Sequence, residues 1–371
     1  MGAGNNQRTF NTATFGIDLG AFDPNGEVLG PVNTYDVRGR VQANLFDPAA
    51  LARVRAARTA ASAADLESIA QAEGAASQAA AAYVRVLHAD AVLQARQADS
   101  ALATDLVTIA REQLRAGTGV ALDVTRAEAQ LAGTRAQLIG ARNDANRARL
   151  ELRRVLNVSL DAPVLLADSL TSLATSAPSA ADEAAMVQEA LARRPDLRAA
   201  QRQVDAARRS VKAARAENLP AVSAFADEGL LGKSVDHLLN TYTWGVQVSM
   251  PLFDGFRREG RVGEQQAVAS EAEVRRRDLE RQAAVEVRGA LLDLRAAQEQ
   301  SEAARERLRL SEQEVSQARQ RFRAGVAGNA DVVTASLSLT TARTALVDAL
   351  TLQQSAQVAL ARARGAVTQL P

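Results

Sequence analysis

Two glycine turns, each set within a long proline-free segment, constrain the fold of this chain more than any other feature. The segments RAGTGVALDV (residues 115–124) and RAGVAGNADV (residues 323–332) lie 208 positions apart. Both are flanked by stretches rich in Ala, Arg, Gln, Glu and Leu, a composition typical of long helices that pack through small residues. Glycine readily adopts the left-handed conformation that ends a helix. We therefore expect Gly117 and Gly325 to be the C′ residues of the first helices of two helical hairpins.

A second pair of segments extends this repeat. NTYDVRGRVQANLFD (33–47) aligns without gaps to NTYTWGVQVSMPLFD (240–254), at an offset of 207 residues. One residue inserted between this segment and the glycine turn of the second repeat accounts for the change in offset from 207 to 208. The sequence therefore predicts a tandem duplication, with a first structural repeat over 1–156, an inter-repeat linker over 157–181 and a second structural repeat over 182–371.

Each repeat is expected to combine strands with helices of unequal length. We expect strands at about 10–21, 33–46, 221–230 and 240–253, and helices at about 48–116, 124–156, 182–219, 257–324 and 332–365. The helix over 48–116 would be about 100 Å long and its return arm over 124–156 only about 50 Å. The helix over 182–219 would supply the missing length, because two short helices stacked end to end match one long helix. Asp123 and Asp331 are expected to be the N-caps of the returning helices.

The returning helices have a seam of small and apolar residues with 3-4 spacing. In the first it comprises Val124, Ala127, Leu131, Thr134, Leu138, Ala141, Ala145, Ala148 and Leu152, and in the second Val332, Ala335, Leu339, Ala342, Leu346, Ala349, Gln353, Ala356 and Leu360. A sustained period of 3.5 residues predicts left-handed coiled-coil packing. Alanine in the seam lets helices approach closely, so each helix needs partners on both sides, as in a closed ring of helices.

The predicted strands alternate apolar and polar residues. One face of the second strand holds Val37, Gly39, Val41, Ala43 and Leu45, and the other holds Asp36, Arg38, Arg40, Gln42 and Asn44. This alternation predicts a sheet with one apolar and one polar face. Two interpretations stay open, a sheet covering a soluble core and a barrel with lipid outside and water inside. Tyr242 and Trp244 favour the barrel, as residues of an interfacial aromatic belt would. Asp47 and Asp254 follow the strands and are expected to cap the next helices.

The composition excludes several kinds of site. The absence of cysteine excludes disulfides, zinc–thiolate sites and thiol catalysis. His88 and His237 are the only histidines, and the sequence has no GxxxxGK[ST] phosphate-binding motif, so we expect no enzyme activity and no cofactor. The 44 basic and 43 acidic residues are well mixed, which argues against nucleic-acid binding. No apolar run approaches the ~20 residues of a membrane-spanning helix.

With these features assembled, the chain resembles the TolC-like outer-membrane efflux proteins. The motifs that support the resemblance occupy residues 80–138, 248–274 and 319–346 and include YVRVLHADAVLQARQADSALATDLVTIAREQLRAGTGVALDV, VSMPLFDGFRREGRVGEQQ and RFRAGVAGNADVVTASLSLTTARTAL. The resemblance implies a mainly α protein with a small β part. Long antiparallel coiled-coil hairpins would form an α-barrel, and four strands per protomer would contribute to the twelve-stranded transmembrane β-barrel of a homotrimer.

The resemblance also implies a place and a set of partners. The barrel would lie in outer-membrane lipid and the helices in the periplasm of a Gram-negative-type envelope. The protein would conduct substrates passively, as the exit duct of a tripartite efflux or type I secretion system. Its partners would be a periplasmic adaptor (membrane fusion) protein and an inner-membrane pump of the RND, MFS or ABC class. The adaptor would contact the hairpin tips, at Arg115, Gly117, Thr118, Gly119, Arg323, Gly325, Val326 and Gly328.

An aperture near the tips is a further implication of the resemblance. Its candidate residues are Asp123, Phe322, Asp331 and Thr334. Asp331 matches a position of an aperture aspartate, and three such carboxylates around an axis attract cations. Thr334 stands where a second acidic residue can occur, Phe322 where some members have a latching tyrosine, and Ala327 replaces a gate arginine. We therefore expect a less acidic aperture, held by apolar contacts if at all, with N-capping as the alternative role of the two aspartates.

Two other functions stay open at this point. A periplasmic adaptor also has a long helical hairpin, but a single one within β-rich domains. A soluble coiled-coil scaffold would not need the alternating strands. The repeat also predicts a helix before the first strand, because the helix over 182–219 shifted back by 207 residues falls almost wholly before Met1. A first helix and a signal peptide are therefore expected to be missing from this chain.

Overall fold

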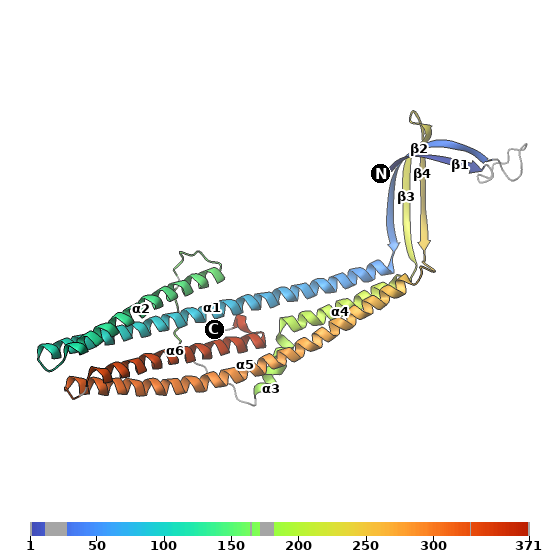
Figure 1. Cartoon of the computed structure of the whole chain (residues 1–371). Coiled ribbons are helices and arrows are strands. Elements are labelled where there is room, and N and C mark those ends of the chain that lie inside the picture. Colours follow the sequence, from blue (N-terminus) through green and yellow to red (C-terminus); the bar gives the residue numbers. More distant parts are fainter. Residues whose placement is uncertain (1, 12–27, 164, 171–181, 327, 370–371) are drawn as a thin grey trace, which may run out of the picture. The chain divides into compact units, whose positions relative to one another are not determined.

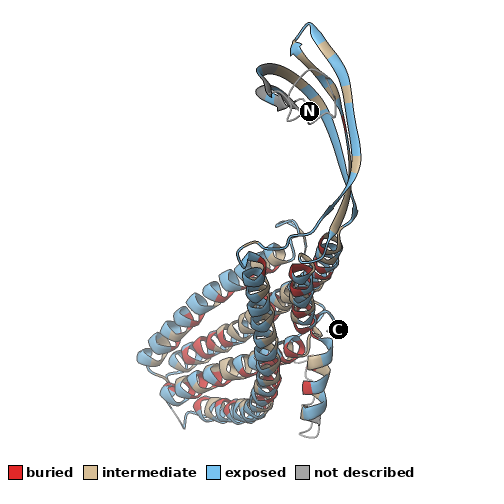
Figure 2. Cartoon of the chain, turned by 90° about the vertical axis from the view of Figure 1, so that its right-hand side faces the viewer, coloured by how far each residue is buried: buried red, intermediate tan, exposed pale blue. Residues whose placement is uncertain are grey.

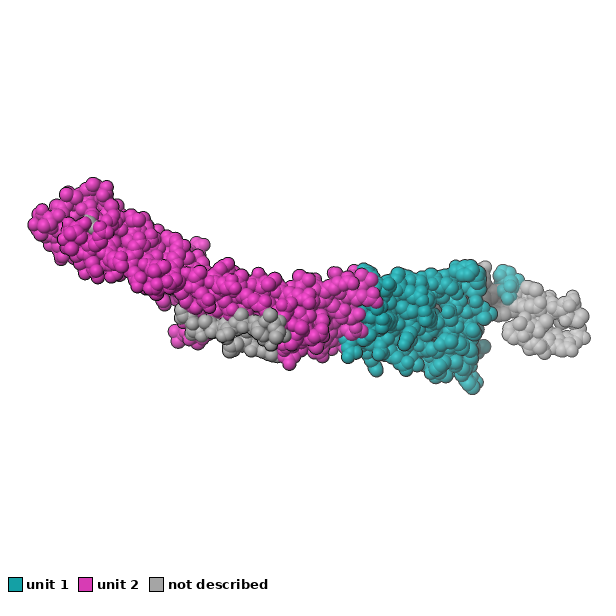
Figure 3. All heavy atoms as spheres, turned by 90° about the horizontal axis from the view of Figure 1, so that it is seen from below, with its two compact units in different colours: residues 1–61, 202–273 teal, residues 62–201, 274–371 magenta. Residues whose placement is uncertain are grey.

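The computed structural model describes residues 2–11, 28–163, 165–170, 182–326 and 328–369. These residues separate into two compact units, coloured in Figure 3. Unit 1 comprises Met1–Ala61 and Arg202–Glu273, and unit 2 comprises Ser62–Gln201 and Val274–Pro371.

The described strands of unit 1 form one four-stranded antiparallel sheet in the order β1-β2-β3-β4 (Figure 1). They are β1 (Gly2–Asn11), β2 (Val28–Phe46), β3 (Ala221–Ser234) and β4 (His237–Ser249). The pairing of β2 with β3 joins segments that are far apart in the sequence. Val41 lies opposite Ala226, which lies opposite Trp244, so these residues share one face of the sheet. The register places Arg40 and Asp227 together on the other face.

The strand that the apolar alternation predicted over 10–21 lies almost wholly outside the described residues, because residues 12–27 are not described. The described strand β1 covers Gly2–Asn11 and shares only its last two residues with that prediction. The sequence of β1, GAGNNQRTFN, has no such alternation, so its backbone pairing with β2 decides its position. The predicted strands over 33–46, 221–230 and 240–253 overlap β2, β3 and β4.

Long helices account for most of the chain. They are α1 (Pro48–Arg115), α2 (Ala121–Val155), α5 (Arg257–Arg323) and α6 (Asn329–Arg364), and a short 3-10 helix, η2 (Val367–Gln369), follows α6. Their bounds lie within three residues of the predicted ones. None of the helices in the described part of the chain is long and apolar enough to cross a membrane.

The single helix predicted over 182–219 is wrong, because the segment forms two helices. These are α3 (Asp182–Arg193) and α4 (Pro195–Ala216). Proline has no N–H to donate, and its ring disfavours the helical conformation of the preceding residue. Pro195 therefore begins a new helix, and Arg194 lies at the break.

Arg194 is buried and anchors this break within unit 2. Its Nε and Nη2 donate to the two carboxylate oxygens of Asp196, at 3.1 and 2.8 Å, and its Nη1 donates to Glu286 Oε2 on α5 at 2.5 Å. Burial by itself would raise the pKa of Asp196, but the bonds from Arg194 are stronger and keep that pKa below its usual range. The α3–α4 break is thus fastened to α5.

The cores of unit 2 are narrow and rich in alanine. Every predicted seam position of α2 and α6 is buried or half-buried, which confirms the seam. Figure 2 shows these buried residues as stripes along helices whose other faces are exposed. One cluster joins α3, α5 and α6 through Val187, Ala190, Val287, Ala290, Leu291, Leu294, Ala297, Ala356, Leu360 and Ala363. Stability therefore depends on close helix approach more than on large side chains.

We expect Ala342→Leu to lower the free energy of unfolding by about 1–3 kcal/mol, because Ala342 is completely buried and extra methyl groups would force the helices apart. Denaturant unfolding in detergent, followed by circular dichroism, measures this change. Gly140→Ala is the matched control. Its added methyl group meets open space on α2, and it should stabilise the protein by about 0.5–1 kcal/mol. An Ala342→Leu protein as stable as the parent would contradict the alanine seam.

Candidate functional site

Both helical hairpins of unit 2 reverse at glycines in the left-handed conformation, as predicted. The φ angles are +76° at Gly117 and +73° at Gly325. The Gly117 N–H donates to the Leu114 carbonyl at 3.2 Å, and the Thr118 N–H donates to the Gln113 carbonyl at 3.0 Å. The second turn repeats both bonds. These paired bonds are the Schellman motif, which satisfies the last carbonyls of a helix.

Asp123 and Asp331 are not N-caps, so that prediction is wrong. The N-cap positions belong to Val120 and Gly328, whose extended backbones start the helices earlier than predicted. Both aspartates lie third in their helices, in the first turn, where the helix dipole favours a carboxylate. The Asp331 side chain is exposed and that of Asp123 half-buried, so both are available for contact with solutes.

Phe322 packs inside unit 2 and does not face solvent. It is 2% exposed and belongs to an apolar cluster contributed by four helices. The other buried members are Ala103, Leu106, Val107, Ala110, Ala127, Leu131 and Val332. In this conformation its ring cannot line an aperture, because the helices surround it. Thr334 is exposed, and its hydroxyl donates to the Ala330 carbonyl at 2.9 Å.

Two side-chain amides join the hairpin tips, which lie side by side at one end of unit 2 (Figure 1). Gln113 Nε2 donates to the Phe322 carbonyl at 2.7 Å, and Asn329 Nδ2 donates to the Asp123 carbonyl at 2.8 Å. These two bonds lie within one chain, and the expectation of an aperture held by apolar contacts stays a prediction. Neither residue was predicted from the sequence, because a glutamine in a polar helix and an asparagine after a glycine form no recognisable pattern.

The ends of the tips are exposed and partly apolar. Val326 is 69% exposed, and Val120 and Leu122 are exposed as well. Among the predicted contact residues, Arg115, Gly117, Thr118, Arg323, Gly325, Val326 and Gly328 are exposed, and Gly119 is half-buried. A Cβ at Gly119 would lie 2.9 Å from the Cβ of Gln113, so the first turn has no room for a side chain there.

The sheet of unit 1 exposes its apolar face more than its polar face. Trp244 is 76% exposed, and Tyr242, Val41 and Val248 are similarly exposed. On the polar face, Asp227 is only 5% exposed. A sheet that covers a soluble core has the opposite distribution, so this pattern favours lipid contact.

The charges of the polar face neutralise one another. Arg38 Nη1 donates to Asp227 Oδ1 at 2.7 Å, and Arg38 Nε donates to Asp36 Oδ1 at 3.2 Å. Arg40 lies 3.6 Å from the other carboxylate oxygen of Asp227. This face of the sheet therefore combines polarity with ordered charge pairs.

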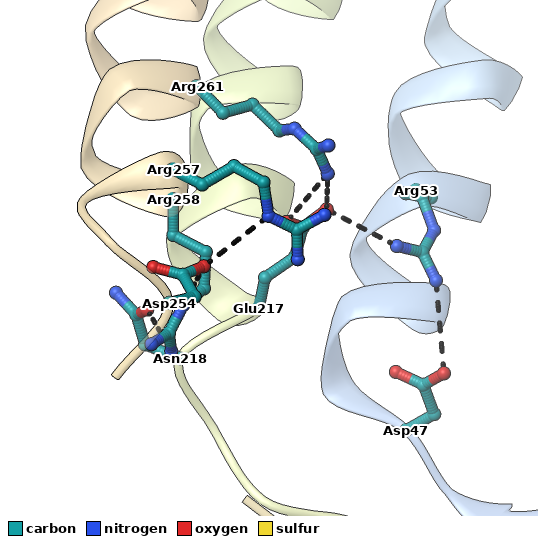
Figure 4. A network of polar contacts seen from close by, with 8 residues as sticks. All are labelled: Asp47, Arg53, Glu217, Asn218, Asp254, Arg257, Arg258 and Arg261. Carbon is teal, nitrogen blue, oxygen red and sulfur yellow. Dashed lines mark hydrogen bonds and ion pairs between the residues drawn. The ribbon is translucent and has the colours of Figure 1, made fainter. Parts of the chain in front are cut away.

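A polar network joins the start of α1, the segment that follows α4 and the start of α5 in unit 1 (Figure 4). Asp47 caps α1 as predicted, since its Oδ1 accepts from the Ala50 N–H at 2.9 Å. Asp254 does not cap α5, so that prediction is wrong. Gly255 and Phe256 form a turn with positive φ before α5 begins at Arg257.

Arg258 is the buried centre of this network. Its Nε donates to Asp254 Oδ2 at 2.8 Å, and its Nη1 donates to Asn218 Oδ1 and to the Pro251 carbonyl, both at 2.9 Å. Desolvation alone would raise the pKa of Asp254, but the Arg258 guanidinium lowers it below its usual range. The network holds the end of α4 and the start of α5 at the base of the sheet.

No group of three or more potential metal ligands converges within the described residues. The geometry instead has three parts, a sheet with an exposed apolar face, helices with alanine seams, and a pair of joined hairpin tips. None of these parts holds a set of titratable groups suited to catalysis.

Comparisons with known proteins agree with this geometry. The family model described as Outer membrane efflux protein matches residues 30–158 and 186–366. A comparison with curated proteins gave no match.

Solved structures share the fold. The outer membrane protein VceC of Vibrio cholerae is 22% identical with a TM-score of 0.73, and the match covers 98% of this chain and 86% of that one. The MtrE outer membrane channel of Neisseria gonorrhoeae is 18% identical with a TM-score of 0.74, covering 98% and 80%. The CmeC outer membrane channel of Campylobacter jejuni is 18% identical with a TM-score of 0.71, covering 98% and 77%. The chain belongs to the outer membrane efflux protein family, whose members are TolC-like outer-membrane channels and not enzymes.

Proposed function

We propose that this protein is a homotrimeric exit duct that conducts substrates passively across the outer membrane for a tripartite efflux or type I secretion system. The observation that supports this best is the incomplete sheet of unit 1. A four-stranded sheet with an exposed apolar face cannot close on itself, because spanning barrels need at least about eight strands. Its edge strands, β1 and β4, would leave unpaired backbone groups in lipid.

Three copies satisfy this constraint and leave a channel. Two copies would supply eight strands, and the interior of an eight-stranded barrel is filled by side chains or holds one small ligand. Three copies supply twelve strands and a wider bore. The apolar face, with Tyr242 and Trp244, then contacts lipid, and the polar face, with the Arg38–Asp227 pair, lines water.

The helical hairpins lie in the periplasm and meet the adaptor at their tips. The exposed Val120, Leu122 and Val326 offer apolar surface there, next to the cationic Arg115 and Arg323. An apolar centre with a charged rim suits a protein partner. The inner-membrane pump supplies the energy, since the chain has no nucleotide-binding motif.

Reconstitution tests the function directly. The purified protein in a planar bilayer should give stepwise ion conductance, and chemical cross-linking should stop at the trimer. A protein that stays soluble without detergent and gives no conductance would favour the coiled-coil scaffold instead. Cross-linking that ends at a dimer would contradict the trimer argument.

Trp244 is the only tryptophan, so its fluorescence reports the position of the sheet face. In vesicles containing brominated phospholipid, we expect blue-shifted emission that bromine quenches strongly, because Trp244 faces lipid. The matched control moves the tryptophan by one residue, with Trp244→Phe and Thr243→Trp combined. Thr243 is on the polar face, so that emission should be red-shifted and insensitive to bromine. Equal quenching of both proteins would contradict a barrel.

Asp331 is proposed to face the axis near the aperture, where the trimer brings three copies together. Asp331→Asn should lower the preference for K⁺ over Cl⁻ by about fivefold, the effect of losing about 1 kcal/mol of charge interaction in water. Reversal potentials across a salt gradient measure this preference. Asp144→Asn removes an exposed charge farther along α2 and should leave it unchanged. If the parent and the Asp331→Asn protein had the same preference for K⁺ over Cl⁻, the only role left for Asp331 would be its favourable interaction with the helix dipole of α6.

A further inference from the structure

We propose that Arg53 and Arg257 bind the phosphate groups of anionic phospholipids, and that two Leu-Phe pairs near the ends of β2 and β4 insert among the acyl chains beside them. The inference rests on the proposed function, because it assumes that the sheet of unit 1 lies in the outer membrane. The pairs are Leu45–Phe46 and Leu252–Phe253, which occupy equivalent positions in the two repeats. Each belongs to an LFD segment whose aspartate is part of the polar network in Figure 4.

Both Leu-Phe pairs are exposed, whereas leucine and phenylalanine are usually buried in proteins. Leu252 is 86% exposed, Phe253 is similarly exposed, and more than half of Leu45 and of Phe46 is exposed. Phe256 is exposed as well, and its ring makes an edge-on contact with that of Phe253, with the ring centroids 5.8 Å apart. Exposed leucine and phenylalanine beside cationic residues are typical of surfaces that enter the boundary between lipid headgroups and acyl chains.

The cationic residues beside these pairs are Arg53, in the second turn of α1, and Arg257, the first residue of α5. Both side chains are more than half exposed. Arg53 lies 3.8 Å from Asp47 and 3.5 Å from Glu217, and Arg257 lies 3.6 Å from Asp254 (Figure 4). All three separations are longer than the roughly 2.7–3.2 Å of N–H···O hydrogen bonds, so the N–H donors of both guanidinium groups can bind a ligand.

The carboxylates of this network are bonded more closely to other groups. Asp254 Oδ2 accepts from Arg258 Nε at 2.8 Å, and the two carboxylate oxygens of Glu217 accept from Arg261 Nη1 at 3.1 and 2.9 Å. The network in Figure 4 includes four arginines but only three carboxylates. Glu259 adds an acidic group in the first turn of α5, and the exposed Arg55 on α1 offsets it. The junction between strands and helices therefore has an excess of positive charge.

An anionic phospholipid matches both properties of this surface. Its phosphate can accept two parallel hydrogen bonds from one guanidinium group, and its acyl chains can cover the exposed leucine and phenylalanine side chains. Arginine side chains at a membrane boundary extend toward the headgroups while their apolar stems stay in lipid. A soluble anion would neutralise the arginines but leave the Leu-Phe pairs in water, so the apolar surface favours a lipid.

The test places the only tryptophan at this junction, by combining Trp244→Phe with Phe253→Trp, and measures which lipid contacts it. Trimers of this parent are reconstituted in vesicles of phosphatidylcholine with a minor share of phosphatidylglycerol, and bromine is placed on the acyl chains of one lipid or the other. We expect brominated phosphatidylglycerol to quench the fluorescence more strongly than its share of the bilayer predicts. In this parent, Arg53→Gln and Arg257→Gln should each lower the preference for phosphatidylglycerol about fivefold, the ratio that corresponds to about 1 kcal/mol for one cationic side chain at an anionic lipid surface.

Arg202→Gln is the matched control, because Arg202 is exposed on α4 but lies far from the end of that helix at the junction, and it should leave the preference unchanged. Quenching of conducting trimers by each lipid in proportion to its share, or an unchanged preference in both arginine variants, would overturn the inference and leave the exit duct standing. Loss of the preference on adding inorganic phosphate at constant ionic strength would indicate a site for soluble anions and overturn the lipid as its occupant. A parent protein without conductance would instead overturn the proposed function.

Discussion

Close approach of helices through alanine is the constraint on which the helical part of this protein depends. Ala145, Ala283, Ala297 and Ala342 are completely buried, and alanines make up half of the buried cluster that joins α3, α5 and α6. Such seams cover narrow stripes and leave the opposite faces of the helices exposed. A long helix with two or more stripes finds partners on several sides, which is the packing that a ring of helices needs and a compact globule does not.

Several polar contacts lie where these helices begin or end. Arg258 fastens the start of α5 to the base of the sheet, Arg194 occupies the break between α3 and α4, and Gln113 and Asn329 join the tips. Helix ends have unpaired backbone groups, so directed hydrogen bonds are most useful there. The seams thus make the helices pack, while the ends decide which segments meet.

The sheet and the hairpin tips differ in the surfaces that they expose. The described sheet has an exposed apolar face and two open edges, and the exposed ends of the hairpin tips combine polar and apolar residues. The proposed exit duct needs no catalytic group.

The sequence by itself determined the glycine turns, the seams, the alternation of β2 and β4 and the family, because each is a local pattern repeated along one element. Only the tertiary structure decided the start of β1, which depends on backbone pairing with β2. It also showed that Phe322 is buried, that Val120 and Gly328 take the cap positions expected of the aspartates, and that Gln113 and Asn329 meet the opposite hairpin. These outcomes depend on contacts between residues far apart in the chain, and no spacing within one segment encodes such contacts.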